Sequence, residues 1–176
     1  MYYKTEYTSP VGLTTLASDG DNIIGLWLKG QKYFGGSIGN EMTAKDDLPV
    51  FIAAKNWLDR YFNGANPDIS ELSLSPVGSD FQRMVWAMLC EIPYGKTISY
   101  GDIAKKIAEK TNKPSMSAQA VGGAVGHNPI SIIIPCHRVV GANGSLTGYA
   151  GGIDKKIELL QHEGANMSRL HTPATS

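Results

Sequence analysis

Residues 99–126 read SYGDIAKKIAEKTNKPSMSAQAVGGAVG and predict two short helices in succession. Ser99 is a suitable N-cap for the first helix, which we expect over residues 99–110. Residues 111–114 (TNKP) interrupt the helical pattern, and a second helix follows over residues 117–126. Two helices joined by a short turn indicate a helix-turn-helix.

The second of these helices is rich in glycine. Its core-facing positions are Ala118, Val121 and Val125, whereas its opposite side carries Gln119, Gly123 and Gly126. A glycine inside a helix costs about 1 kcal/mol relative to alanine, but it leaves a smooth surface that another backbone can approach closely. This surface has two interpretations, which are tight packing against another helix and contact with a nucleic-acid backbone or narrow groove.

A further helix is expected immediately upstream. Ser79 and Gln82 have the spacing of a capping box, and one face of the helix that they begin carries Phe81, Val85, Met88 and Leu89. Cys90 falls in the last turn, where we expect a buried structural thiol because free cysteine is usually buried.

A second cysteine follows the glycine-rich helix. The apolar run Ile130–Ile134 predicts a buried strand, and Pro135-Cys136-His137-Arg138-Val139 comes directly after it. The thiolate is the reactive form of cysteine, so a reactive cysteine needs a base or a positive charge nearby. His137 and Arg138 supply both, although a Cys-His dipeptide alone is a weak signal.

The last helix is expected over Ile153–Glu163, with Asp154 as its cap and Gly164 as its stop. Glu163 lies near the edge of the inward-facing stripe and needs a partner, because a buried charge must be paired. Residues from about 167 onward are polar, and we expect them to fray.

The N-terminal half predicts a small α/β domain. Three short strands with turn residues between them (residues 2–8, 13–17 and 22–28) indicate an antiparallel meander. A loop to Lys45 precedes a helix over Leu48–Phe62, and a linker is expected over residues 66–78. We therefore expect two domains, residues 1–78 and residues 79–176.

Composition limits the class of protein. The net charge is zero, but residues 1–78 carry six Lys and Arg against nine Asp and Glu, and residues 79–176 carry ten against seven. The excess of basic residues in the second half is a weak indication of nucleic-acid binding. Two cysteines suggest a reducing compartment. No apolar run is long enough for a membrane span, and no signal peptide is evident, so we expect a cytoplasmic protein, or a nuclear one if the source is eukaryotic.

The second half resembles the O6-alkylguanine-DNA alkyltransferases. Seven motifs occur in the family's order: Phe81-Gln82 with Val85-Trp86, Ile92–Tyr100, Ala120–Ala124, Asn128-Pro129, Pro135–Val139, Thr147–Gly152, and Leu159-Leu160 with Glu163-Gly164. The first half resembles the family's variable N-terminal domain only loosely. The resemblance implies an α/β protein in which a small antiparallel sheet-plus-helix domain precedes a mostly helical, winged-helix-like DNA-binding domain.

The resemblance also implies an activity. Family members flip a damaged guanine out of double-stranded DNA and transfer the O6-alkyl group to their own cysteine, once per molecule. It implies no cofactor and a monomer that acts on duplex DNA. A resident metal is not expected, since residues 1–78 contain no Cys or His and Cys136-His137 has no second ligand cluster. Whether O4-alkylthymine is also repaired stays open, as does the largest alkyl group accepted.

Catalytic roles follow by resemblance. Cys136 is the alkyl acceptor, and His137 takes the thiol proton through a water held by Glu163. Tyr100 is the candidate proton donor to the departing guanine. We expect this relay and nearby helix N-termini to lower the pKa of the Cys136 thiol.

Substrate-binding roles follow in the same way. Tyr149 lies beside the flipped base, the Ala150 amide donates to O6, and the Cys136 and Val139 carbonyls accept from the exocyclic amine. Asn128 braces the turn that leads to the cysteine. The remaining residues assigned to substrate or DNA binding are Gln119, Gly123 and Arg138.

One departure from the family pattern affects DNA binding. Many members have an arginine where this chain has Gln119, and glutamine is shorter and uncharged, so weaker duplex binding is expected. Residues 107–116 are also longer than the corresponding loop in many members.

Two rival functions were weighed against alkyl transfer. A non-enzymatic protein that binds alkylated DNA and flags it typically has tryptophan at the cysteine position, and Cys136 argues against that class. A sequence-specific regulator is disfavoured because a glycine-rich recognition helix reads base edges poorly.

Overall fold

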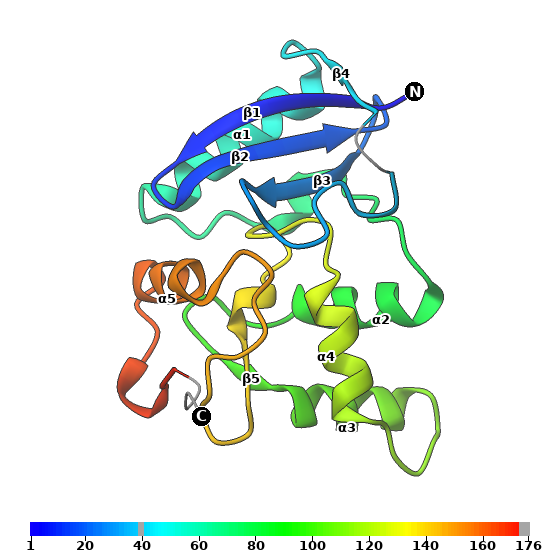
Figure 1. The fold of residues 1–176 in the computed structure, drawn as a ribbon, viewed down its shortest axis with the longest axis vertical. Coiled ribbons are helices and arrows are strands. Elements are labelled where there is room, and N and C mark those ends of the chain that lie inside the picture. The colour runs from blue at the N-terminus through cyan, green and yellow to red at the C-terminus, as the bar shows by residue number, and fades with distance from the viewer. Residues whose placement is uncertain (39–40, 173–176) are drawn as a thin grey trace.

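The structure is a computed structural model that describes residues 1–38 and 41–172. The N-terminal half is a four-stranded sheet in the order β3-β2-β1-β4, with α1 (Pro49–Phe62) packed on one face (Figure 1). Its strands are β1 (Tyr3–Ser9), β2 (Gly12–Ser18), β3 (Ile23–Leu28) and β4 (Thr43–Ala44). β1, β2 and β3 form the predicted antiparallel meander.

The segment before α1 differs from the predicted loop. It contains a 3₁₀ turn, η1 (Gly36–Ile38), and β4, which pairs in parallel with β1. Strand β4 has only two residues and both are exposed. It therefore carries no hydrophobic alternation that could have revealed it in the sequence.

The second half is mostly helical, as predicted. Its elements are α2 (Asp80–Leu89), β5 (Ile98–Ser99), α3 (Tyr100–Lys110), α4 (Ala118–Gly126), η3 (Cys136–Arg138), β6 (Val139–Val140), α5 (Ile153–His162) and η4 (Met167–Arg169). Strands β5 and β6 pair in parallel, which places η3 beside the start of α3. Helices α3 and α4 form the expected helix-turn-helix at one end of the molecule (Figure 1).

Three helices begin where the sequence indicated. The hydroxyls of Ser79, Ser99 and Ser117 each accept a backbone N–H three residues along the chain, and Ser79 with Gln82 completes the capping box. α5 differs, because its N-cap is Gly152 at φ +101° and Asp154 lies inside the first turn without a capping bond. A glycine is favoured at that positive φ, so the cap lies two residues before the predicted one, whereas the helix itself begins at Ile153 as predicted.

The buried face of α4 is also shifted from the prediction. Val121 and Val125 are buried, but Ala118 is exposed and Ala124 takes its place in the core. The reason is that α2 meets α4 near Ala124, where the Trp86 indole N–H donates to the Ala124 carbonyl at 2.8 Å.

Residues 130–134 are buried as predicted, but they do not form a strand. Only Ile130 bridges a neighbouring strand, at Leu26 of β3. The chain then turns, with Ile132 at φ +70° and the Ile134 N–H bonded to the Ile130 carbonyl at 3.0 Å. Apolar composition predicted burial correctly, but a compact turn and a buried strand have the same composition.

The predicted linker and tail are both more ordered than expected. Residues 66–78 include the 3₁₀ turn η2 (Ile69–Glu71), and Ile23 exchanges backbone hydrogen bonds with Ser73 and Ser75 at 2.8 and 2.9 Å. Beyond residue 167, η4 forms and His171 bridges Ser145. Residues 173–176 lie outside the described part of the chain.

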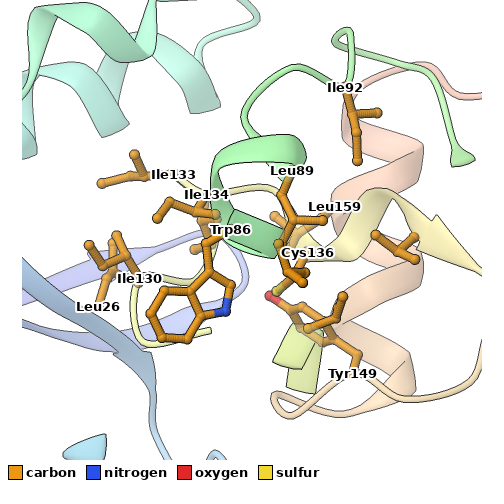
Figure 2. Close-up of a cluster of buried hydrophobic side chains, with 14 of the residues drawn as sticks. Leu26, Trp86, Leu89, Ile92, Ile130, Ile133, Ile134, Cys136, Tyr149 and Leu159 are labelled. Atoms are coloured by element: carbon orange, nitrogen blue, oxygen red, sulfur yellow. The ribbon is translucent and has the colours of Figure 1, made fainter. Parts of the chain in front are cut away.

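One hydrophobic cluster joins the two halves. It includes Leu26 of the sheet, Trp86 of α2, Ile130 and Ile134 of the buried turn, and Cys136 (Figure 2). The segment that carries Cys136 is therefore held in a close-packed core rather than on a surface loop. Among the described residues, no helix combines the length and apolar character needed to cross a membrane.

Candidate active site

Cys136 lies at the first position of η3 and is 6% exposed. The segment before it is fixed by Asn128, whose side-chain amide donates to the Ile134 carbonyl at 2.8 Å and whose oxygen accepts from the Ile130 N–H at 3.0 Å. Tyr149 is also buried, and its ring points toward Cys136 (Figure 2). The cysteine is therefore aimed by a braced turn rather than by the end of a strand.

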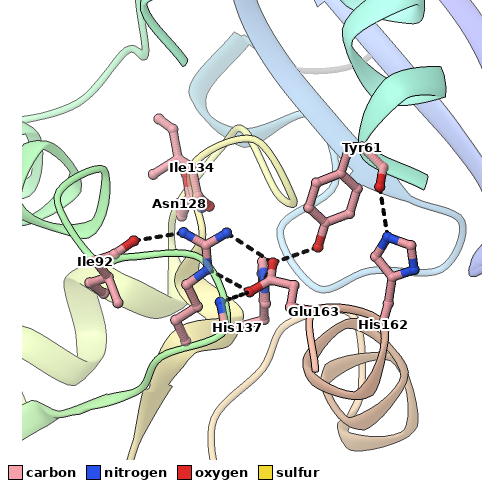
Figure 3. A network of polar contacts seen from close by, with 9 residues as sticks. Tyr61, Ile92, Asn128, Ile134, His137, His162 and Glu163 are labelled. Carbon is pink, nitrogen blue, oxygen red and sulfur yellow. Dashed lines mark hydrogen bonds and ion pairs between the residues drawn. The ribbon is translucent and has the colours of Figure 1, made fainter. Parts of the chain in front are cut away.

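Glu163, at the C-cap of α5, is the centre of a buried network (Figure 3). Its Oε2 accepts from Tyr61 Oη at 2.5 Å, His137 Nε2 at 2.7 Å and Arg138 Nη2 at 2.9 Å. Its Oε1 accepts from Arg138 Nε at 2.8 Å and the Gly95 N–H at 3.1 Å. The partner that the sequence required for this carboxylate is thus a set of five donors.

These donors keep Glu163 ionised. Burial opposes ionisation, but the hydrogen bonds from His137 and Arg138 outweigh it, and the pKa of the carboxyl lies well below its usual range. Gly95 contributes its N–H at φ +77°, and a Cβ there would lie 2.9 Å from the Glu163 carbonyl oxygen. Glycine is therefore needed at position 95 for the network to close.

His137 is fully buried and faces this carboxylate with one nitrogen only. An ionised carboxylate accepts hydrogen bonds and donates none, so the proton of neutral His137 is on Nε2 and Nδ1 keeps a free lone pair. Nδ1 has no hydrogen-bond partner among residues 1–38 and 41–172. Burial lowers the pKa of His137 despite the opposing effect of Glu163, so the imidazole is neutral and Nδ1 can accept a proton.

The relay therefore differs in one respect from the expected arrangement. The water was expected to lie between His137 and Glu163, but these two side chains are in direct contact at 2.7 Å. Any water that joins the thiol to the base must lie on the Nδ1 side of the ring.

The expected lowering of the Cys136 pKa is wrong for this structure. Burial raises the pKa of the thiol, and the opposing effects of the Asn128 side chain and the Lys156 charge do not offset it. The resting residue is a neutral thiol, so its proton must leave during the reaction rather than before it.

Tyr100 and Lys156 converge on one backbone carbonyl. Tyr100 Oη and Lys156 Nζ both donate to the Thr147 oxygen, at 2.9 and 2.8 Å. Burial raises the pKa of Tyr100 to about 12, so the hydroxyl keeps its proton at neutral pH. Lys156 was not among the site residues predicted from the sequence, although it lies seven residues before Glu163 on the inward face of α5.

Arg138, which the sequence assigned to substrate or DNA binding, points into the interior of the protein. Its side chain is 8% exposed, and its guanidinium binds both oxygens of Glu163 and the Ile92 carbonyl at 2.7 Å. The fork geometry of arginine suits this two-point contact with a carboxylate. The residue belongs to the interior network because the chain turns inward at η3.

A groove of about 600 Å³ lies between α4 and residues 148–153. Gly123 of α4 lines one side, and Tyr149 and Ala150 line the other. The N-terminal half contributes Lys32 and Tyr33, which the sequence analysis did not assign. Gln119 is exposed in the first turn of the same helix, and Val139 is buried in β6.

Two models of one protein family match the two halves of the chain. Residues 80–165 match the family model for the 6-O-methylguanine DNA methyltransferase DNA-binding domain, and residues 1–76 match the ribonuclease-like domain of the same family. The chain belongs to the 6-O-methylguanine DNA methyltransferase family.

Individual relatives resemble nearly the whole chain. A methylated-DNA–protein-cysteine methyltransferase of Haemophilus influenzae is 43% identical over 92% of this chain and 86% of its own. The crystal structure of the Mycobacterium tuberculosis O6-methylguanine methyltransferase is 41% identical and superposes with a TM-score of 0.78, covering 99% of this chain and 97% of that one. A structure of the M. tuberculosis protein in complex with DNA gives 0.76 over 96% and 94%.

Proposed function

We propose that this chain repairs O6-alkylguanine in double-stranded DNA by extruding the base and moving the alkyl group onto Cys136. By family membership, the chain is a DNA-repair enzyme that transfers an alkyl group from DNA to a cysteine of the protein. The proposal adds the acceptor, the lesion, the duplex substrate and a monomer that acts once. The observation that carries it is the buried Cys136-His137 pair, in which Nδ1 of a neutral imidazole is free and Nε2 is held by Glu163.

The proposed reaction is an in-line displacement. The Cys136 sulfur attacks the alkyl carbon, a C–S bond forms, and the C–O6 bond breaks with its electron pair left on guanine. The thiol proton passes toward His137 Nδ1, and Glu163 stabilises the imidazolium that results. Tyr100 donates a proton to the departing guanine, so the base leaves neutral. The proton taken up by His137 is then returned to the Tyr100 phenolate, which leaves both side chains in their starting protonation states. The thioether is stable, so no second turnover follows.

The groove between α4 and residues 148–152 is the proposed site for the extruded base. Tyr149 flanks the base, and the Ala150 N–H donates to O6. The Cys136 carbonyl already accepts from the Val139 N–H, but it keeps a second lone pair for the exocyclic amine of guanine, and the Val139 carbonyl is assigned the same role. Gly123 is assigned to the DNA backbone, and Asn128 to bracing the cysteine turn. Gln119 is assigned to the gap that the extruded guanine leaves in the base stack, where it can hydrogen-bond the orphaned cytosine.

The division of labour between residues 1–78 and 79–176 is part of the proposal. The second segment carries the acceptor and the DNA-binding helices. Residues 1–78 cover the acceptor network through α1, whose Tyr61 donates a hydrogen bond to Glu163. The competing function, non-enzymatic binding of alkylated DNA, would leave the protein mass unchanged.

The decisive test is the mass of the intact protein after incubation with a duplex that contains one O6-methylguanine. We expect a single gain of about 14 Da, one methylene, because the acceptor reacts once. The gain should be lost in Cys136→Ser and kept in Cys90→Ser, the matched control at the other cysteine. Tight binding without a mass gain would favour the lesion-flagging function.

A further inference from the structure

Among the described residues of the N-terminal half, one side chain hydrogen-bonds to the Glu163 carboxylate. Tyr61 lies in α1, is 1% exposed, and donates its hydroxyl to Glu163 Oε2 at 2.5 Å across a separation of 102 residues (Figure 3). His162, the neighbour of Glu163 in α5, also binds this residue, because its Nε2 contacts the Tyr61 carbonyl at 2.7 Å. Two contacts thus fix the tyrosine relative to the end of α5.

The tyrosine ring is held rigidly. It stacks on Trp57 with ring centroids 5.8 Å apart and 6° between the planes. Phe62 and Tyr94 meet it edge-on, at 4.9 and 6.0 Å. The hydroxyl position is therefore set by packing and not by the hydrogen bond alone.

The hydroxyl competes directly with the base. Tyr61 Oη and His137 Nε2 donate to the same oxygen of Glu163, whereas Arg138 contacts both oxygens. Each donor polarises the carboxylate toward itself, so Glu163 Oε2 accepts the hydrogen bonds of the other donors less strongly. A protonated His137 is stabilised by the charge on Oε2, so the Tyr61 hydroxyl reduces that stabilisation.

We propose that Tyr61 is a positioning residue for alkyl transfer, and that the N-terminal half uses it to set how readily His137 accepts the thiol proton. This inference rests on the proposed function of Cys136 and His137. Tyr61 acts through Glu163 and does not touch the reacting atoms. Its effect is to keep the base neutral at physiological pH, when a free Nδ1 is required.

Other groups around the network act on His137 as well. Arg138 and Cys136 flank it in η3, Lys156 and His162 face the site from α5, and Tyr94 approaches from the loop after α2. The positive charges of Arg138 and Lys156 disfavour the imidazolium. None of these groups is the hydrogen-bond partner of the Tyr61 hydroxyl, which is Glu163, so substitution of the hydroxyl removes none of their hydrogen bonds.

The test is the pH profile of the single-turnover alkyl-transfer rate for Tyr61→Phe, from about pH 5.5 to about pH 9. The rate falls on the acid side where His137 becomes protonated. We expect this acid limb to shift upward by about one pH unit, with a rate at the alkaline plateau within about twofold of wild type. Tyr7→Phe is the matched control, because Tyr7 donates its hydroxyl to Asp59 of the same helix at 2.8 Å, away from the site.

A second variant should shift the acid limb of the pH profile in the opposite direction. Difluorotyrosine at position 61 keeps the ring and makes the hydroxyl a stronger donor, so the acid limb should shift to lower pH. This variant also serves if Tyr61→Phe does not fold. An acid limb that superposes on wild type in either folded variant overturns the proposal, even if the thermal midpoint falls.

The failure of this inference is distinguishable from failure of the proposed function. If wild-type protein gains no mass from the alkylated duplex, the proposed function is wrong. If wild type reacts and the acid limb does not depend on Tyr61, only the role of Tyr61 is wrong.

Discussion

At the scale of single residues, two buried charges differ in how far they are compensated: Lys156 within α5 and Glu163 at its C-cap. Glu163 accepts five hydrogen bonds, two of them from the guanidinium of Arg138, so its charge is fully compensated. Lys156 is equally buried, but its one hydrogen bond goes to the neutral Thr147 carbonyl. A buried ammonium without a carboxylate partner is costly, and proteins keep such groups at functional sites.

Lys156 has a pH-dependent effect on stability with a definite sign. Burial lowers its pKa from 10.5 to about 8, although the nearby Cys136 thiolate would act in the opposite direction. Between these values the unfolded chain binds a proton that the folded chain does not. The free energy of unfolding therefore rises as pH increases from about 8 to 10.5, by up to roughly 3 kcal/mol from this group.

Replacement of Lys156 by methionine should separate stability from activity. Lys156→Met removes the buried charge and leaves the Thr147 carbonyl bonded to Tyr100, so we expect a gain of about 1–3 kcal/mol in unfolding free energy at pH 7. The alkyl-transfer rate should fall, because the positive charge favours the Cys136 thiolate. Urea unfolding and single-turnover rates measure both.

The matched control is Lys155→Met, since Lys155 is partly exposed and forms only a weak surface pair with Glu158 at 3.6 Å. It should leave both quantities near their wild-type values. A less stable Lys156→Met would contradict this account of the buried charge.

At the scale of elements, the glycine-rich face of α4 is open. A Cβ built on Gly123 or on Gly126 would meet no atom within 4 Å in the part of the chain that the structure describes. Tight packing against another helix therefore does not explain these glycines. Gln119 is exposed at the start of the same helix. The geometry therefore agrees with the other interpretation, in which a nucleic-acid backbone approaches this face of α4.

The substitution Gly123→Ala should have opposite effects on folding and on binding. Alanine favours the helix, so the free energy of unfolding should increase by about 0.5–1 kcal/mol. The added methyl group should weaken binding to an alkylated duplex about fivefold, or about 1 kcal/mol. Thermal unfolding and fluorescence anisotropy at fixed salt concentration measure the two effects.

Gly101→Ala in α3 is the comparison for that substitution, because its Cβ would meet only the Ser99 hydroxyl at 3.8 Å. It should leave duplex binding unchanged. If Gly123→Ala bound the duplex as tightly as wild type, the glycine face would not contact DNA.

At the scale of the whole molecule, Cys136, the proposed acceptor, is part of the core that joins the two halves. Cys136 packs in the same cluster as Leu26 of the sheet and Trp86 of α2. A methyl group on its sulfur must be accommodated by residues of both halves, since close-packed interiors have little free volume.

Methylation of Cys136 should therefore lower the stability of the whole chain. Insertion of one methyl group into a packed core costs about 1–3 kcal/mol, which corresponds to a fall of about 2–12 °C in Tm for a chain of this size. Calorimetry before and after reaction with the alkylated duplex checks this. Cys136→Ser treated with the same duplex is the control, and an unchanged Tm after methylation would mean that the pocket already has room for the group.

The sequence by itself determined the features that depend on neighbouring residues. Ser79, Ser99 and Ser117 cap their helices because a side-chain oxygen meets an N–H three residues away in any helix. The three-strand meander followed from turn residues between short apolar runs. The seven ordered motifs identified the family for the same reason, since they are properties of order and spacing.

Only the tertiary structure decided the contacts between distant parts of the chain. The compact turn at residues 130–134, the inward direction of Arg138 and the bond from Tyr61 to Glu163 all depend on which surfaces meet after folding. A sequence shows that Glu163 needs a partner, but it does not show which of the available donors arrives. The tertiary fold brings Tyr61 to Glu163 across 102 residues of sequence, because a buried carboxylate must be hydrogen-bonded.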